Sequence, residues 1–202
     1  MSVWQLPSTW TDEHALREAW QAADPFPHLI VDDFAGDAEL PRLLDILEDE
    51  PVERYANEIY AFEASAPEPV TDAVRSLRNE FADVLSPVLS RVTGKPVRRV
   101  DLRAYAYRVG HYLLPHTDHQ DGLKRALAYA YYLPSPEPPR GGELELFRCE
   151  QSQGVLTSTV PARLIEPRAN RLVVFDVSDV SLHQVREVLG GLRISLAGWF
   201  YP

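Results

Sequence analysis

His116, Asp118 and His183 are the residues of this chain whose types and spacing could hold a metal ion. His116 and Asp118 lie two positions apart, and in an extended segment such residues point to the same side. An isolated H-x-D occurs by chance in many proteins, so this pair alone indicates little. Adding His183 gives two imidazoles and one carboxylate, the facial triad of non-haem Fe(II) sites. The alternative for His183 is a half-buried strand histidine without a ligand.

Arg193 and Ser195 form a second candidate binding pair, two residues apart on one predicted strand. A buried guanidinium can hold a carboxylate through two hydrogen bonds, and a nearby hydroxyl can add another. The pair therefore suits one end of a dicarboxylate. The plainer alternative is that Arg193 pairs with an internal Glu or Asp, because an unpaired buried charge is costly.

The other histidines and the single cysteine are not expected to bind metal. His111 and His119 lie near the first pair, but three donors already complete a triad, so solvent-facing or supporting positions are expected. His14 lies in a predicted helix and His28 before a strand. Cys149 is the only cysteine of the sequence, so an internal disulfide and any multi-cysteine zinc site are excluded, which agrees with a reducing compartment.

The first half of the chain is expected to be mostly helical. The spacing of apolar residues predicts helices at 11–23, 36–50 and 69–94, with a short strand at 27–34. Thr11 or Asp12 is expected to cap the first helix and Asp37 the second. Pro87 is expected to kink the third helix or to end it early, and Gly94 is expected to mark its end.

The second half changes to short apolar or alternating runs separated by Gly and Pro. These runs predict about seven strands, at residues 97–107, 125–133, 141–147, 162–167, 171–177, 182–188 and 192–200. Without a long helix between them, they favour an antiparallel sandwich or barrel. Hairpin turns are expected at Asn170 and at Gly190 and Gly191, and Gly141 and Gly142 would allow a tight entry into a strand.

Composition limits the class of protein. The 202 residues, 45% apolar and 25% charged, predict one domain, with a mostly helical support region over 1–95 and a strand-rich core over 96–202. The net charge of −10 argues against nucleic-acid binding. The N-terminal sequence lacks the pattern of a secretory signal, and no apolar run is long enough to cross a bilayer. We expect no membrane association and a cytoplasmic location.

Five sequence blocks carry a family resemblance. In order they are YRVGHYLLPHTDHQDG, RALAYAYYLP, PPRGGELELF, PRANRLVVFDVSDVSLHQVREV and GGLRISLAGWF. Together they resemble the Fe(II)/2-oxoglutarate-dependent dioxygenases, in particular the prolyl-4-hydroxylase-like branch, over roughly residues 97–202. The resemblance implies a mainly β fold with flanking helices: a double-stranded β-helix (jelly roll, cupin-like) backed by N-terminal helices.

The resemblance also implies roles for the candidate residues. Fe(II) would be held by the catalytic residues His116, Asp118 and His183. The distal carboxylate of 2-oxoglutarate would be bound by Arg193, with Ser195 as a weaker helper.

Two tyrosines match positions that contact the cosubstrate in this branch, namely Tyr107 and Tyr132. Strand register decides whether these or the neighbouring tyrosines face the site, and packing in the core is the alternative for each.

The implied activity is hydroxylation of a C–H bond, of a prolyl residue in a peptide or protein or of a free amino acid. It would consume 2-oxoglutarate and O2 and release succinate and CO2, with ascorbate as a candidate supporting reductant. A small-metabolite hydroxylase of a biosynthetic pathway is the main alternative. A cupin-type metal protein without 2-oxoglutarate turnover and a binding module without catalysis are the others. The sequence predicts neither the substrate nor the oligomeric state.

Overall fold

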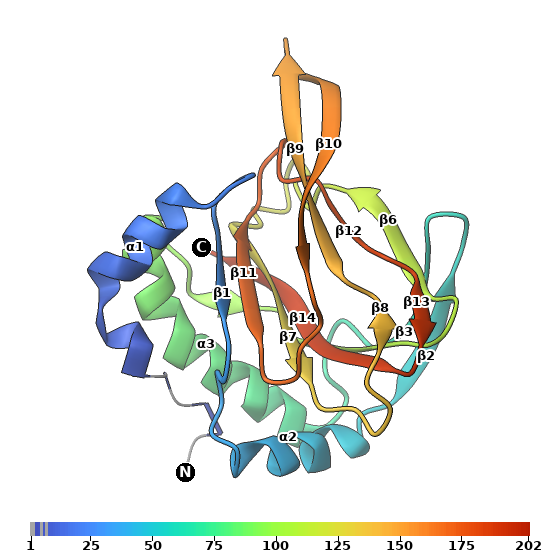
Figure 1. Cartoon of the computed structure of the whole chain (residues 1–202). Helices are drawn as coiled ribbons and strands as arrows, with labels where there is room; N and C mark the ends of the chain where they lie inside the picture. The colour runs from blue at the N-terminus through green and yellow to red at the C-terminus, as the bar shows by residue number, and fades with distance from the viewer. Residues whose placement is uncertain (1–2, 5, 7) are drawn as a thin grey trace.

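The computed structural model describes residues 3, 4, 6 and 8–202, which form a curled antiparallel sheet with helices against one side (Figure 1). The helices are η1 (Ser8–Thr11), α1 (Glu13–Ala22), α2 (Glu39–Glu48) and α3 (Asp72–Thr93). The strands of the first half are β1 (His28–Val31), β2 (Val52–Ala56) and β3 (Tyr60–Ser65). Those of the second half are β4 (Arg99–Val100), β5 (Arg103–Tyr107), β6 (Tyr112–His116), β7 (Leu127–Leu133), β8 (Arg140–Gly141), β9 (Leu144–Ser152), β10 (Val155–Ile165), β11 (Leu172–Asp176), β12 (His183–Val185), β13 (Val188–Gly190) and β14 (Arg193–Tyr201).

The three predicted helices are all present, with two differences at the level of single residues. Asp12 caps α1 as expected, by accepting a hydrogen bond from the amide of Ala15. The prediction for Asp37 is wrong, because α2 follows Ala38 without a side-chain cap. The early end at Pro87 is wrong too: α3 continues to Thr93 because buried residues on both sides of the exposed proline pack against the sheet. Among the described residues, no helix combines the length and apolar character needed to span a bilayer.

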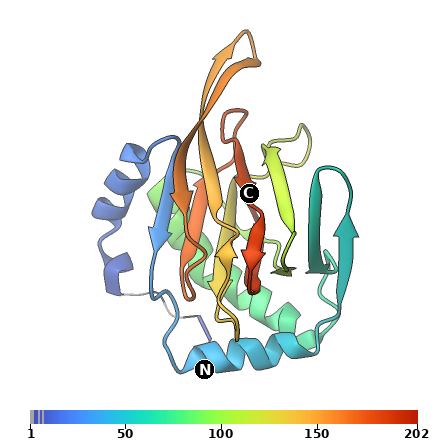
Figure 2. The same cartoon turned by 45° about the vertical axis from the view of Figure 1, so that its right-hand side comes forward.

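Two strands of the first half were not predicted. β2 and β3 form a hairpin, and β3 also pairs with β5 and β6, so this segment belongs to the main sheet. The hairpin lies at the side of the molecule away from β1 and α1 (Figure 2). β2 is mostly exposed, and an edge strand that faces water has no regular apolar alternation to reveal it.

The sheet runs in the order β1-β11-β7-β14-β5-β3-β6-β12-β9-β10, with β2 added beside β3 and β4 beside β14. A separate pair joins β13 to β8. The distal part of the β9–β10 hairpin projects beyond the rest of the sheet (Figures 1 and 2). The curled antiparallel sheet with helices on its outer side confirms the predicted jelly roll backed by N-terminal helices.

The alternation of side chains along β7 explains the two cores of the molecule. All seven residues of β7 are buried, which is why its sequence reads as a continuous apolar run. One face packs with the helices through Leu127, Tyr129, Tyr131 and Leu133. The opposite face packs inside the curled sheet through Ala128, Ala130 and Tyr132. The candidate site lies on this inner face.

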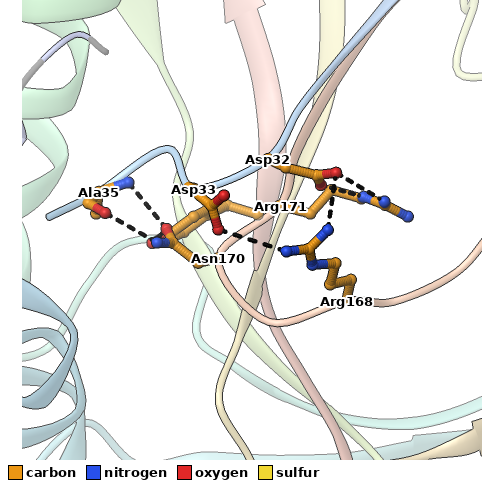
Figure 3. A network of polar contacts seen from close by, with 7 residues as sticks. Asp32, Asp33, Ala35, Arg168, Asn170 and Arg171 are labelled. Atoms are coloured by element: carbon orange, nitrogen blue, oxygen red, sulfur yellow. Dashed lines mark hydrogen bonds and ion pairs between the residues drawn. The ribbon is translucent and has the colours of Figure 1, made fainter. Parts of the chain in front are cut away.

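The turn between β10 and β11 is fixed to the segment after β1 by a polar network (Figure 3). Asn170 has φ 64°, which confirms the expected positive φ. Its side-chain amide accepts a hydrogen bond from the amide of Ala35 and donates one to the carbonyl of Ala35, both at 2.8 Å. Next to it, Arg171 donates to both carboxylate oxygens of Asp32 at 2.6 and 3.0 Å. The network holds the end of β1 beside β11.

Candidate active site

The structure brings the three predicted metal donors together. His116 ends β6 and His183 begins β12, and the two residues are direct partners in the antiparallel register of these strands. Asp118 follows β6 by two residues and is buried. One donor atom from each side chain lies within 4.8 Å of the other two.

The orientation of the two imidazoles suits a shared ion. Their Nε2 atoms face the carboxylate of Asp118, His116 at 3.8 Å and His183 at 3.5 Å. Each Nδ1 instead lies next to a backbone carbonyl, that of Leu114 at 2.9 Å and that of Ser181 at 3.0 Å. A proton assigned to each Nδ1 would be donated to that carbonyl, which leaves the Nε2 lone pair free for a metal.

The protonation of His183 also favours coordination. Burial lowers the pKa of His183 to about 4, against the opposing effect of the Asp118 carboxylate, and the neighbouring His116 lowers it further. The ring is therefore neutral at neutral pH, as a metal ligand must be.

Arg193 is only 3% exposed and faces the same cavity from β14. Its guanidinium donates a 3.3 Å hydrogen bond to the hydroxyl of Ser195, and its Nε has no partner. Among the described residues, no Asp or Glu carboxylate lies within 4 Å of the Arg193 guanidinium. The alternative, that Arg193 pairs with an internal acid, is therefore wrong. A buried guanidinium in this state is suited to bind an anion from outside the chain.

The two predicted tyrosines flank Arg193. The Cζ atom of Arg193 lies 4.7 Å from the ring centre of Tyr107 and 4.9 Å from that of Tyr132. Burial raises the pKa of Tyr107, so its hydroxyl keeps its proton and can donate. The hydroxyl of Tyr132 is buried and has no hydrogen-bond partner. Tyr129 and Tyr131 pack instead with the helix-side core, as the alternation along β7 requires.

All of the predicted site residues except Tyr132 line a cavity of about 350 Å³. The metal donors, Arg193 and Ser195 line it together with an aromatic wall from β2, β3 and β5, made of Tyr55, Tyr60, Phe62, Tyr105 and Tyr107. Metal donors and an unpaired cation in one cavity are suited to a ligand that bridges an ion and a guanidinium.

Trp199 was not a candidate site residue from the sequence. It is half-buried and lines the cavity, whereas Phe200 is fully buried on the helix side. The guanidinium carbon of Arg125 lies 3.5 Å from the ring centre of Trp199. The period of two along β14 puts Trp199 on the face of Arg193 and was the available signal.

The remaining histidines lie outside the donor cluster. His119 is exposed and faces Asp179 at 3.4 Å, and His111 is buried with an unpartnered Nδ1.

Known proteins share both the sequence pattern and the fold. A family model described as the 2OG-Fe(II) oxygenase superfamily matches residues 102–201. The prolyl 3-hydroxylase OGFOD1 of Mus musculus is 33% identical over 192 residues, which cover 88% of this chain and 33% of that protein. The chain thus spans about a third of the length of this relative.

Two solved structures resemble most of the chain. A prolyl-4-hydroxylase of Pseudomonas putida gives a TM-score of 0.68 at 22% identity, covering 92% of this chain and 98% of that one. A prolyl hydroxylase of Trichoplax adhaerens, in complex with a hypoxia inducible factor oxygen degradation domain peptide fragment, gives a TM-score of 0.68 at 16% identity. This match covers 96% of this chain and 94% of that one. At these identities the likeness establishes the fold, including the helical layer.

Proposed function

The chain belongs to the 2OG-Fe(II) oxygenase superfamily, and from this premise we propose that it hydroxylates a prolyl C–H bond in a reaction that depends on Fe(II) and 2-oxoglutarate. One observation carries the proposal. Arg193, which is buried and has no carboxylate partner among the described residues, shares its cavity with a His-Asp-His cluster, which is the combination that a metal-bound dicarboxylate requires.

The donor set fits the iron. His116, Asp118 and His183 would hold it, because two neutral imidazoles and one carboxylate suit Fe(II) and leave other coordination positions open. When bound, Fe(II) with 2-oxoglutarate and O2 supplies the oxidation that inserts one oxygen atom into a C–H bond and releases succinate and CO2. The backbone carbonyls of Leu114 and Ser181 would keep both imidazole rings oriented.

The unpaired polar atoms fit the cosubstrate. The Nε of Arg193 and the hydroxyl of Tyr132 are buried without partners, and a carboxylate has the acceptor atoms for both. Arg193 would hold the distal carboxylate of 2-oxoglutarate, with Ser195 and the hydroxyls of Tyr107 and Tyr132 as further donors. Their burial would exclude water from this end of the cavity.

The substrate is proposed from the names of similar proteins. OGFOD1 of Mus musculus is a prolyl 3-hydroxylase, and the solved structures include prolyl hydroxylases. A prolyl residue of a peptide or protein, or free proline, is therefore the proposed substrate. A cytoplasmic location and the exclusion of nucleic acid stay predictions from composition.

A non-enzymatic or 2-oxoglutarate-independent metal protein accounts less well for the cavity. Such a protein needs no receptor for a dicarboxylate, and a buried unpaired arginine would only lower its stability.

The test is a titration of the protein with 2-oxoglutarate under anaerobic conditions in the presence of Fe(II). We expect a visible charge-transfer band, followed after addition of O2 and ascorbate by succinate and by a prolyl product heavier by one oxygen. Asp118→Ala should lose the band and the succinate. Unchanged succinate formation in Asp118→Ala would contradict the metal assignment, and absence of the band in the wild type would contradict the proposed cosubstrate.

A further inference from the structure

The cavity has a second cationic residue, Arg103, which the proposed roles leave unused. Arg103 lies on β5 and lines the cavity. It pairs in register with Ala197, four residues beyond Arg193 on β14. Four residues of a strand span about 13 Å, so Arg103 and Arg193 lie well apart along the same inner face.

Arg103 is held in position but keeps an unpaired donor. Its Nε donates a 2.7 Å hydrogen bond to the backbone carbonyl of Ser65, which fixes the direction of the guanidinium. Its Cζ atom lies 5.4 Å from the ring centre of Tyr55 and 5.3 Å from that of Tyr105. Its Nη2 is buried and has no hydrogen-bond partner. The guanidinium is thus pre-organised between two aromatic rings.

No internal acid neutralises this charge. Within the described part of the chain, no carboxylate lies within 4 Å of Arg103. Glu63, on the neighbouring strand β3, pairs instead with the exposed Arg108 at 2.9 Å. Asp118, the acid that lines the cavity, belongs to the metal cluster. In a chain with a net charge of −10, a guanidinium that lines a cavity without a carboxylate partner is suited to bind an anion.

We propose that Arg103 binds a carboxylate of the substrate, so that the substrate is a prolyl compound with a carboxylate on the ring or on an adjacent residue. The inference rests on the proposed function and adds the substrate class to it. Arg193 would take the cosubstrate at one end of the cavity, and Arg103 would take the substrate anion at the other. The carboxylate is either that of a free or C-terminal proline or that of an Asp or Glu beside an internal proline.

Selectivity follows from the geometry of a guanidinium. A carboxylate accepts two charge-assisted hydrogen bonds, whereas the neutral amide of the same shape places an N–H against the donors. Charge-assisted hydrogen bonds of this kind correspond to about 10- to 100-fold in affinity. We therefore expect wild-type protein to prefer an acid over its amide by this factor.

The experiment compares three matched pairs of probes on the full chain loaded with Mn(II) and 2-oxoglutarate without O2. The pairs are L-proline and L-prolinamide, acetyl-glycyl-proline as acid and as amide, and an internal prolyl peptide with Glu or with Gln before the proline. Calorimetry gives the dissociation constant of each probe. The pair that shows the preference identifies which carboxylate Arg103 takes.

Three variants connect the preference to Arg103. Arg103→Met should reduce the acid-to-amide ratio to about 1, and Arg103→Lys should keep part of it. Arg108→Met is the matched control, because it removes an exposed and already paired guanidinium next to the same strand. The control should keep the full ratio. All variants should bind 2-oxoglutarate as the wild type does, which shows that the fold and the Arg193 end are intact.

The outcomes separate the inference from the proposed function. Equal affinity of wild type for acid and amide in all three pairs, or a preference that persists in Arg103→Met, would overturn the role of Arg103. Succinate formation without an acid preference would leave the oxygenase and remove only this inference. An Arg103-dependent preference without succinate or oxidised product would support the anion-binding role of Arg103 and contradict the proposed oxygenase function.

Discussion

His183, one of the proposed metal ligands, should make the stability of the protein depend on pH. Burial lowers its pKa from the ordinary 6.5 to about 4. Between these values the unfolded chain binds a proton at His183 and the folded chain does not. A proton that binds only to the unfolded state favours unfolding. The unfolding free energy therefore falls as pH falls from 6.5 to about 4 and rises again as pH rises.

Urea unfolding of the metal-free protein should show this effect. Between pH 4 and 6.5 the unfolding free energy of the wild type should rise more than that of His183→Gln, by on the order of 1–3 kcal/mol. His14→Gln is the control, because it removes an exposed histidine outside the donor cluster. Parallel profiles for wild type and His183→Gln would show that His183 titrates normally in the folded protein.

Arg193 should determine the affinity for 2-oxoglutarate. Loss of a buried bidentate ion pair in Arg193→Met should raise the Kd by about 100-fold or more, and Arg193→Lys should recover only part of it. Ser195→Ala should have a smaller effect, about 10-fold or less, because one neutral hydrogen bond is lost. Anaerobic titration of the metal-loaded protein measures each Kd. A normal Kd in Arg193→Met would remove Arg193 from the cosubstrate site.

The elements with a buried face were predictable from the sequence. Helices α1 and α3 and strands such as β7 and β14 present apolar residues at a regular period, because one or both faces pack into a core. β2 was missed because it is exposed, and β6 because Pro115 interrupts its pattern. The projecting part of the β9–β10 hairpin is exposed too, which hid its length.

The candidate site likewise has a part that could be predicted from local sequence and a part that could not. The candidate metal donors and Arg193 lie in sequence blocks whose order carries information, so they could be predicted from the sequence, and the structure places them in one cavity. Arg103 and Tyr55 meet only because the β2–β3 hairpin pairs beside β5, a contact between distant segments that no local spacing reveals. Long-range strand pairing is set by the whole fold, and this part of the site needed the structure.

The β10–β11 turn depends on Asn170 for both its backbone and its contacts. Asn170→Ala would place at φ 64° a residue that tolerates the left-handed region less well than Asn, and it would remove the side-chain hydrogen bonds to Ala35 and to the hydroxyl of Tyr131. We expect a loss of about 2–4 kcal/mol in unfolding free energy. Asn170→Gly relieves the backbone strain and keeps only the loss of the bonds, so it should be less destabilising. Equal stability of Asn170→Ala and wild type in urea unfolding would contradict this role.

At the scale of the whole molecule, the first half of the chain does more than cover the sheet. β3 lies between β5 and β6 and thereby joins the two parts of the curled sheet, and β1 extends it beside β11. α3 covers the outer face through fully buried Phe81, Leu85 and Leu89. The expected support region is thus also part of the sheet. We propose on this basis that residues 1–95 and 96–202 form one folding unit.

A fragment of residues 96–202 should therefore fail to fold on its own, although it holds every proposed metal and cosubstrate ligand. Without α3, the fragment exposes a contiguous apolar face that includes Leu127, Tyr131 and Phe200. Without β3, the strands β5 and β6 lose the partner that joins them. We expect the fragment to be insoluble or to lack near-ultraviolet circular dichroism, and co-expression with residues 1–95 to restore both solubility and metal binding. Cooperative unfolding of the isolated fragment would show instead that the strand-rich half is a domain by itself and that the helical half is an addition to it.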